Sequence, residues 1–273
     1  MPQRPVPVVL SIAGSDSGGG AGIQADLKAF ARCGVHGATA ITAITLQNTV
    51  EVRGVEPVSP DAIRGQVSAV VDDLGVDAVK VGMLGDVATI EAVAGALRAL
   101  PAGTPVVVDP VMVAESGARL LAAEAHSALV EQILPLATVV TPNVPEARAL
   151  AGVGEEAPAE ELARAVHALG PANVVVTGGH REEATDVFFD GHDLVAIPGE
   201  RFAGAAAHGS GCTHSSALAA HLALGHEPLD AARAAKTVAA EAVRDGLAGL
   251  GRDAGPVDVF GLARRSSTAG AAR

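Results

Sequence analysis

Apolar runs of strand length alternate with segments of helical period along most of the chain. The first run, 6–13, is continuously apolar, which is typical of a strand buried on both faces of a sheet. A flexible glycine-rich loop is expected at 14–20. Apolar side chains then recur at helical spacing and predict a helix that ends near Gly34, through Ile23, Leu27, Phe30 and Ala31.

The same alternation continues through the rest of the chain. Strands are expected at 38–45, 50–58, 79–83, 105–109, 137–141 and 173–177, and helices at 60–74, 87–99, 122–134 and 158–169. The segments 185–189 and 193–197, joined by Asp190-Gly191, predict a hairpin. Two more helices follow, one from Gly211 and one at 228–246. Repeated strand–helix alternation predicts an α/β fold with one mainly parallel sheet, covered by helices on both faces.

The length of 273 residues suits one large domain, and neither an internal repeat nor a linker divides the chain. We expect a single domain over 1–263 and a disordered tail over 264–273. No apolar run reaches the roughly 18 residues that span a bilayer, and the N-terminus lacks a signal-peptide pattern. Cys33 and Cys212 match no metal-binding spacing and suit a reducing compartment. These features predict a soluble, cytoplasmic protein.

Charge and aromatic content restrict the ligands. The formal net charge of −12 argues against a surface for nucleic acid or for an anionic membrane. A polyanionic substrate would need a local cradle or a metal ion to overcome that field. The chain has no Trp, no Tyr and five Phe. A planar ligand would therefore be held mainly by aliphatic side chains, backbone groups and hydrogen bonds.

The stretch 208–216 reads His-Gly-Ser-Gly-Cys-Thr-His-Ser-Ser and precedes an alanine- and leucine-rich segment. Small residues in this order are typical of a tight loop that opens a helix. Free N–H groups at a helix start attract anions, and Gly209 and Gly211 let a ligand approach the backbone closely. We expect a lowered pKa for the Cys212 thiol at this position. The alternative is a small-residue helix start that binds nothing.

Acidic residues follow two expected strands, at the edge of the sheet where ligands of such folds bind. Asp109 comes directly after Val106-Val107-Val108, and Glu146 lies just past the next strand and begins a helix. Both side chains are hard oxygen ligands of the kind that Mg²⁺ prefers. Taken alone, Asp109 fits a turn and Glu146 fits the N-terminal charge of a helix. Together with the expected anion cradle at 209–212, they favour a joint metal and phosphate site.

Three other polar residues leave alternatives open. The carboxamide of Gln47 suits an amidine-like edge such as an aminopyrimidine, although on sequence alone a strand-end amide that bonds to local backbone is favoured. Lys80 lies inside an apolar strand, where we expect a strand residue with a solvated head. Lys236, one of only three lysines, lies on the last helix, either at the site or as simple surface charge.

The first glycine-rich loop invites a nucleotide-binding interpretation. It contains no Gly-Lys-Ser/Thr and is therefore not a P-loop. Gly20-x-Gly22-x-x-Ala25 fits a loose dinucleotide fingerprint, but the second strand ends in Gln47, where that fingerprint expects an acid. A loop that closes over a small ligand is favoured.

Several blocks together resemble the hydroxymethylpyrimidine/phosphomethylpyrimidine kinases of thiamine biosynthesis. The first block begins at Ser11 and reads Ser-Ile-Ala-Gly-Ser-Asp-Ser-Gly-Gly-Gly-Ala-Gly-Ile-Gln-Ala-Asp-Leu-Lys. The others are Thr45-Leu-Gln-Asn-Thr, Lys80-Val-Gly-Met-Leu, Asp109-Pro-Val-Met-Val, Thr141-Pro-Asn-Val-Pro-Glu, Gly178-Gly-His and His208-Gly-Ser-Gly-Cys-Thr. They run in family order from about residue 8 to residue 245.

The resemblance implies a ribokinase-like three-layer fold, a homodimer, and ATP with Mg²⁺. It implies two successive phosphorylations, of 4-amino-5-hydroxymethyl-2-methylpyrimidine and then of its monophosphate. Carried over to this chain, the implied roles are an active-site thiol at Cys212 and an anion hole at Gly209, Ser210 and Gly211. The implied substrate-binding positions are Gly14, Asp26, Gln47 and Met83, the ATP-binding positions are Asn143, Thr177, His180 and Lys236, and the Mg²⁺ positions are Asp109 and Glu146.

Two blocks depart from the family pattern. The lysine of a common Lys-Gly-Gly-His is Thr177 here, and the common Lys-Ser-Gly-Asp is Glu115-Ser-Gly-Ala118. Both changes remove positive charge from the expected phosphate path. Lys236, Arg119, Mg²⁺ or backbone groups are the candidates for compensation.

Three alternative functions remain open. A pyridoxal/pyridoxine kinase of the same fold would differ mainly in the ring that Gln47 and Met83 contact. A cysteine hydrolase would pair Cys212 with His208 or His214, although it gives no use for the acidic pair. A non-catalytic pyrimidine sensor would keep the pocket but would need no thiol or acids.

Overall fold

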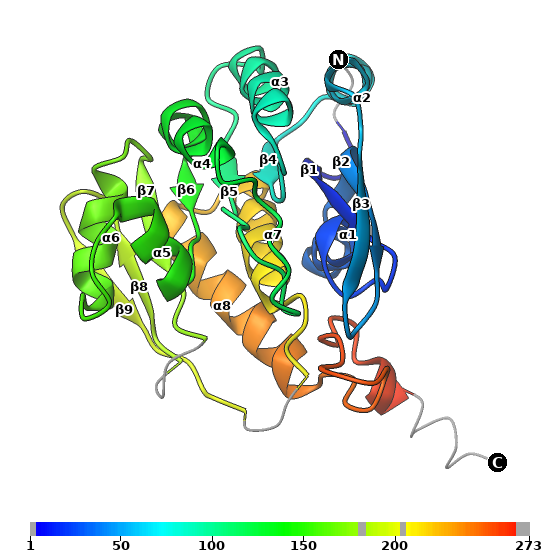
Figure 1. Ribbon diagram of the computed structural model, residues 1–273, viewed down its shortest axis with the longest axis vertical. Coiled ribbons are helices and arrows are strands. Elements are labelled where there is room, and N and C mark those ends of the chain that lie inside the picture. Colours follow the sequence, from blue (N-terminus) through cyan, green and yellow to red (C-terminus); the bar gives the residue numbers. More distant parts are fainter. Residues whose placement is uncertain (1–3, 180–183, 203–205, 266–273) are drawn as a thin grey trace.

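The computed structural model describes residues 4–179, 184–202 and 206–265. In this part of the chain, nine strands form one sheet (Figure 1). Their bounds are β1 Val8–Asp16, β2 His36–Gln47, β3 Val52–Pro57, β4 Ala78–Val81, β5 Val106–Val108, β6 Val139–Val140, β7 Asn173–Val176, β8 Asp186–Phe189 and β9 Leu194–Ile197. The spatial order is β3-β2-β1-β4-β5-β6-β7-β8-β9. In this spatial order, the six neighbouring strands β2, β1, β4, β5, β6 and β7 run parallel. At one edge β3 pairs antiparallel with β2, and at the other edge β8 and β9 continue the sheet by antiparallel pairing.

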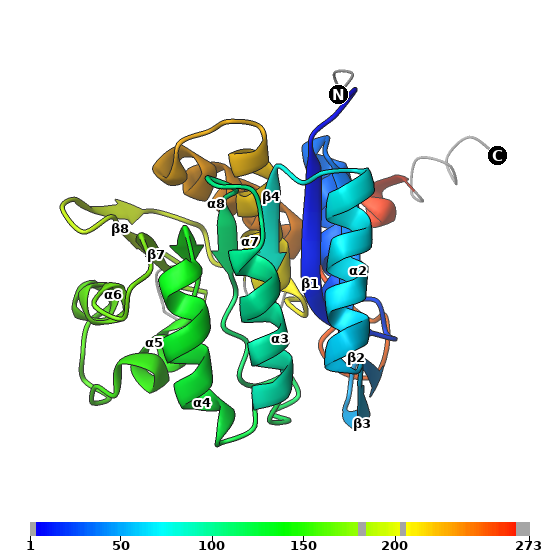
Figure 2. The same cartoon turned by 90° about the horizontal axis from the view of Figure 1, so that it is seen from above.

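Helices cover both faces of this sheet (Figure 2). The bounds are α1 Gly22–Cys33, α2 Pro60–Asp73, α3 Val87–Arg98, α4 Ala125–Ala128, η1 Leu129–Ile133, η2 Leu134–Leu136, α5 Val144–Ala151, α6 Ala159–His167, α7 Ser210–Ala223 and α8 Pro228–Arg244. The helices from α2 to α6 pack on one face, and α1, α7 and α8 pack on the other.

The alternation of side chains along each strand explains the two layers. Val106 and Val108 of β5 join the core under α2 to α6, while Val107 between them joins the core under α7 and α8. Because both faces are covered, the central strands β5 and β6 are apolar at every position, which is the pattern that predicted them. The predicted mainly parallel sheet, covered on both faces, is confirmed.

Most predicted elements are confirmed, including the hairpin of β8 and β9, but two expectations were wrong. The loop expected from residue 14 begins later, because β1 continues after a bulge and pairs Ser15 with Ile44 and Asp16 with Thr45. The helix expected at 122–134 is divided into α4, a π-helical turn (η1) and a 3₁₀ turn (η2) that contains Pro135. Proline cannot donate a backbone hydrogen bond, so a regular helix ends there.

The end of the described chain packs against the domain. Arg264 belongs to the predicted tail and lies 2.6 Å from Asp245 in an ion pair, while residues 266–273 are outside the described part. Among the described helices, none combines the length and the apolar character needed to cross a bilayer.

Candidate active site

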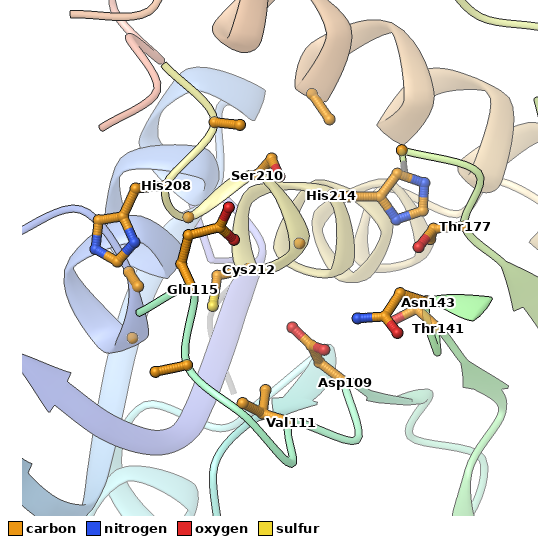
Figure 3. A pocket seen from close by; sticks show the side chains of 18 of the residues that line it. Asp109, Val111, Glu115, Thr141, Asn143, Thr177, His208, Ser210, Cys212 and His214 are labelled. Carbon is orange, nitrogen blue, oxygen red and sulfur yellow. The ribbon is translucent and has the colours of Figure 1, made fainter. Parts of the chain in front are cut away.

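A cavity of about 660 Å³ lies at the carboxyl ends of the parallel strands. It is lined by nearly all of the predicted site residues: Gly14, Gln47, Met83, Asp109, Asn143, Glu146, Thr177, Gly209, Ser210, Gly211, Cys212 and Lys236. Figure 3 shows Cys212 and Asp109 at its centre, with Asn143, Thr177 and His214 on one side and His208 on the other. The predicted residue His180 lies outside the described part of the chain.

The start of α7 forms the anion cradle. Gly209 caps the helix with a φ of 84°, and a Cβ there would lie 1.7 Å from the carbonyl oxygen of Gly20. Only glycine fits this position. Among the described residues, no hydrogen-bond acceptor is found for the N–H groups of Gly211 and Cys212. The N–H group of Ser210 was also expected to bind the anion, but in the structure it donates to the Ala207 carbonyl at 2.9 Å.

The loop between β1 and α1 is tied to this cradle by Asp16. Its carboxylate accepts the N–H groups of Gly18, Gly20 and Ala21 at 2.7, 3.0 and 2.8 Å. His208 Nε2 lies 3.0 Å from the same carboxylate. Burial alone would raise the pKa of Asp16, but the hydrogen bonds from His208 and the loop hold it below its usual value.

Asp16 and His208 were not among the predicted site residues. An aspartate at the end of an apolar strand was the available signal, since Asp109 was found in that way. Within the described residues, no hydrogen bond joins His208 or His214 to the Cys212 thiol, and a cysteine hydrolase requires such a contact between base and nucleophile.

Asp109 and Glu146 form the acidic part of the site. Burial raises the pKa of Asp109, although Lys80 and a 3.0 Å hydrogen bond from Ser215 oppose the change. Burial and the neighbouring Asp109 raise the pKa of Glu146 to about 8. Glu146 and Asn143 also form the capping box that begins α5, with distances of 2.9 and 3.0 Å. Helix capping therefore fixes Glu146 at the cavity wall.

The donor set fits a magnesium ion whose remaining ligands come from elsewhere. Each of the two carboxylates disfavours the ionised form of the other, so a bound cation would stabilise both negative charges. Within the described ranges, no cluster of three or more His, Cys, Asp or Glu side chains has metal-binding geometry. Phosphate oxygens and water would have to complete the coordination of Mg²⁺ here, as is usual for this ion.

The Cys212 thiol lies in the cavity, but its expected low pKa was wrong. Burial raises the pKa to about 12; Lys80 opposes this, and the carboxylates Asp109 and Asp26 add to it. The N–H group of Gly22 also bonds to the sulfur. Desolvation among carboxylates therefore outweighs the helix start on which the expectation was based.

Lys80 and Asp26 also differ from expectation. The side chain of Lys80 is fully buried, with Nζ 3.0 and 3.2 Å from the two Asp26 oxygens and 3.9 Å from Asp109. Ser11 and Ser216 donate to Asp26 at 2.5 and 2.7 Å. Asp26 lies beneath the cavity and does not line it. Its predicted contact with the substrate stays a prediction; in the structure it holds Lys80 in the cavity floor, where a solvated head had been expected.

At one end of the cavity, Gly14, Gln47 and Met83 lie together. A Cβ at Gly14 would come within 3.2 Å of the Met83 sulfur, so glycine leaves this wall open. Gln47 Oε1 lies 3.2 Å from the Thr45 hydroxyl, whose proton is donated to the Ser15 carbonyl at 2.6 Å, so the carboxamide keeps hydrogen-bonding capacity for a ligand. A planar ring at this end would contact aliphatic and sulfur atoms on its faces and an amide at its edge.

The opposite end contains Asn143, Thr177, Asp186, His214 and Lys236. An isolated bridge aligns Asn143 with Thr177. Lys236 Nζ lies 2.6 Å from Asp186, and His214 Nε2 lies 3.3 Å from the same carboxylate. Burial alone would raise the pKa of Asp186, but His214, Lys236 and the Gly178 N–H together lower it. Asp186 and His214 were not predicted as site residues of the kinase.

Comparisons with known proteins agree with this arrangement. The family model of phosphomethylpyrimidine kinase matches residues 16–258. A hydroxymethylpyrimidine/phosphomethylpyrimidine kinase of Rhizobium meliloti (strain 1021) is 50% identical over 260 residues, covering 93% of this chain and 97% of that protein.

Two solved structures share the fold. A phosphomethylpyrimidine kinase from Clostridium difficile 630 superposes with a TM-score of 0.77 at 38% identity, over 87% of this chain and 99% of that one. An ADP complex of Bacillus subtilis pyridoxal kinase gives a TM-score of 0.85 at 40% identity, over 94% and 99%. The expected ribokinase-like fold is thereby confirmed, and the chain belongs to the phosphomethylpyrimidine kinase family.

Proposed function

We propose that this protein transfers the γ-phosphate of ATP to the hydroxymethyl group of hydroxymethylpyrimidine and then phosphorylates the monophosphate, in thiamine biosynthesis. One observation carries the proposal: three parts of a site lie in a single cavity. One end, at Gln47, suits a planar ring; the start of α7 lies beside Asp109 and Glu146; and the other end contains Lys236. Membership of the phosphomethylpyrimidine kinase family supports the same reaction.

The pyrimidine would lie at the end formed by Gly14, Gln47 and Met83. The carboxamide of Gln47 offers the donor and acceptor that the aminopyrimidine edge requires. This placement points the hydroxymethyl group toward Cys212 and the start of α7, where the phosphoryl group is transferred.

The free N–H groups of Gly211 and Cys212 would hold the migrating phosphoryl group at the positive end of α7. Preorganised donors of this type matter most in such a reaction, and losing one typically costs roughly 2.7–4 kcal/mol of barrier. Asp109 and Glu146 would hold Mg²⁺, which supplies positive charge to the phosphate oxygens. Lys80, fixed by Asp26 in the cavity floor, adds a permanent positive charge near Asp109.

Cys212 would accept the proton of the alcohol. Only the thiolate can do so, because a protonated thiol has no place for a second proton. Since burial raises the pKa of this thiol to about 12, its own proton would first have to leave to solvent, and Mg²⁺ held by Asp109 and Glu146 would favour that loss by offsetting the charge of the neighbouring carboxylates. Phosphoryl transfer is loose, so the base contributes less than the positioning of the reactants.

The second phosphorylation requires the cradle to accept a substrate that already carries a phosphate. We propose that the segment 112–120 moves between the two steps, since it borders the cavity and its Val113 side chain is exposed. The loop after β1 is less suited to this movement, because Asp16 and His208 tie it to α7.

A homodimer in the cytoplasm is proposed from the same resemblance. Ile44 and Leu46 of β2 are exposed apolar side chains on the edge hairpin with β3, which supports burial against a second copy. Sedimentation of the full chain tests this directly, with a dimer as the expected species.

A pyridoxal kinase activity is the second candidate, because the similar Bacillus subtilis structure is a pyridoxal kinase. We expect kcat/KM for hydroxymethylpyrimidine to exceed that for pyridoxal when both are measured with ATP and Mg²⁺. A higher value for pyridoxal would reverse the assignment. A cysteine hydrolase is disfavoured because, among the described residues, neither His208 nor His214 bonds to the Cys212 thiol.

A further inference from the structure

Asp186 is a buried carboxylate in the cavity wall. It begins β8, its side chain is 1% exposed, and it lines the cavity. Its Oδ1 accepts the Gly178 N–H at 2.8 Å and the Lys236 ammonium at 2.6 Å. His214 Nε2 faces the other oxygen at 3.3 Å. Two hydrogen-bond donors hold one oxygen of this buried carboxylate and an imidazole faces the other, so the group is held in one orientation.

The lysine that Asp186 holds is the one available at this end of the cavity. Lys28 bonds to the Gly19 carbonyl and Lys80 pairs with Asp26, so both are committed elsewhere. Lys236 crosses the cavity wall from α8, and Gly199 leaves room for it, since a Cβ there would lie 2.3 Å from Lys236 Cε. An ammonium has three N–H donors, and the contact with Asp186 uses one of them. Among the described residues, the other two donors have no partner, so they can bind a ligand in the cavity.

We propose that Asp186 is a positioning residue that aims Lys236 at the phosphates of the nucleotide. Lys236 would supply, from α8, the cationic N–H donors that the family pattern places at residue 177 and that this chain lacks there. Arg119, the other basic side chain considered for this role, is exposed and does not line the cavity. This inference rests on the proposed kinase function.

Two other roles of Asp186 give different results. If the carboxylate mainly cancels the charge of Lys236, its removal would strengthen the binding of a phosphate ligand. If it only ties α8 to β8, its removal would lower stability and leave nucleotide affinity unchanged. If Asp186 positions Lys236, removal of its carboxylate weakens nucleotide binding, and it does so only while Lys236 is present. A neutral hydrogen-bond acceptor at residue 186 should then restore the binding.

The test is ADP affinity of the full chain, measured by titration calorimetry without Mg²⁺. We expect Asp186→Ala to weaken binding about tenfold or more, as for a lost charge-assisted contact. Asp186→Asn keeps an acceptor for Gly178 and Lys236 and should stay within about twofold of the wild type. Asp186→Glu keeps the charge but displaces it, and should also weaken binding. With Lys236→Met already present, Asp186→Ala should add little.

Asp190→Ala is the matched control. Asp190 follows the same strand but is half-buried, and its hydrogen bonds to described residues lie within the hairpin turn, so ADP affinity should not change. Thermal denaturation identifies variants that fail to fold. If Asp186→Ala fails to fold, the ADP affinity of Asp186→Glu provides the test. Equal or tighter ADP binding by Asp186→Ala, or a full additional loss on Lys236→Met, would overturn the positioning role. Failure of the wild-type protein to bind ADP would overturn the kinase function itself.

Discussion

At the residue scale, Cys212 shows how burial can reverse an argument from local sequence. A thiol at a helix start is expected to ionise easily, since the backbone N–H groups stabilise a negative charge. In the folded protein Cys212 is half-buried, and desolvation together with the negative charges of Asp109 and Asp26 raises the pKa of its thiol to about 12. Neither acid is near Cys212 in the sequence, so the local pattern cannot reveal them.

The raised pKa predicts slow alkylation of Cys212. In a Cys33→Ala background, about one thiol in ten thousand would be ionised at pH 8. The rate with iodoacetamide should therefore rise about tenfold for each pH unit between 7 and 10, without a plateau. A small free thiol measured in parallel provides the reference. A plateau below pH 8 would show that the helix start dominates after all.

Removing the thiol should reduce turnover while the fold survives. We expect Cys212→Ala to lower kcat by roughly tenfold to a hundredfold, the range for a base that contributes modestly to a loose transition state. The melting temperature should change by only a few degrees. Cys33→Ala, which alters the other thiol, should keep full turnover. If Cys212→Ala also keeps full turnover, the thiol has no part in the mechanism.

The buried pair of Lys80 and Asp26 should contribute strongly to stability. Lys80→Met leaves the Asp26 carboxylate buried without its cation, which typically costs about 3–5 kcal/mol. Urea unfolding measures this loss. The double variant Lys80→Met/Asp26→Leu removes both charges and should recover most of the stability. If the single variant is as stable as the wild type, the pair is not buried as described.

At the element scale, the site depends on a contact between the loop after β1 and the start of α7. Gly20 lies against both His208 and Gly209, and Asp16 bonds to His208 from 192 residues away. The helix start was predictable from its small residues, but the element that supports it was not. A pattern of glycines shows where a backbone can approach closely, and only the fold shows what approaches it.

Two glycines of the cradle should differ sharply in their tolerance of a side chain. Gly209→Ala combines a positive φ with a clash against the Gly20 carbonyl, so we expect a loss above about 2 kcal/mol in urea unfolding. Gly211→Ala is the matched control, because its Cβ would meet nothing within 4 Å. Its stability should stay within about 0.5 kcal/mol of the wild type. Equal losses for both variants would contradict the described contact.

At the scale of the whole molecule, the periodicity of the sequence was enough to predict the layers and most strands. Buried strands such as Val106–Val108 are apolar at every position, and this pattern survives without knowledge of their neighbours. The location of the site followed as well, because the ends of parallel strands meet at one edge. Asp109, Glu146 and Gln47 were found in this way.

Partnerships across long sequence separations were not predictable. Lys80 and Asp26 are 54 residues apart, and Lys236 and Asp186 are 50 apart. Each lysine alone resembles a surface charge, and only the packed fold supplies the carboxylate that holds it. The same reason explains why Asp16 and Asp186 were missed, since each acts through a residue on another element.

The central claim is that one cavity performs two successive phosphorylations of a pyrimidine. The most direct measurement is ³¹P NMR of a reaction that contains the purified full chain, ATP, Mg²⁺ and hydroxymethylpyrimidine. The monophosphate should appear first and the diphosphate should follow, with one ADP formed for each phosphate transferred. Absence of both products while the protein remains folded would contradict the account.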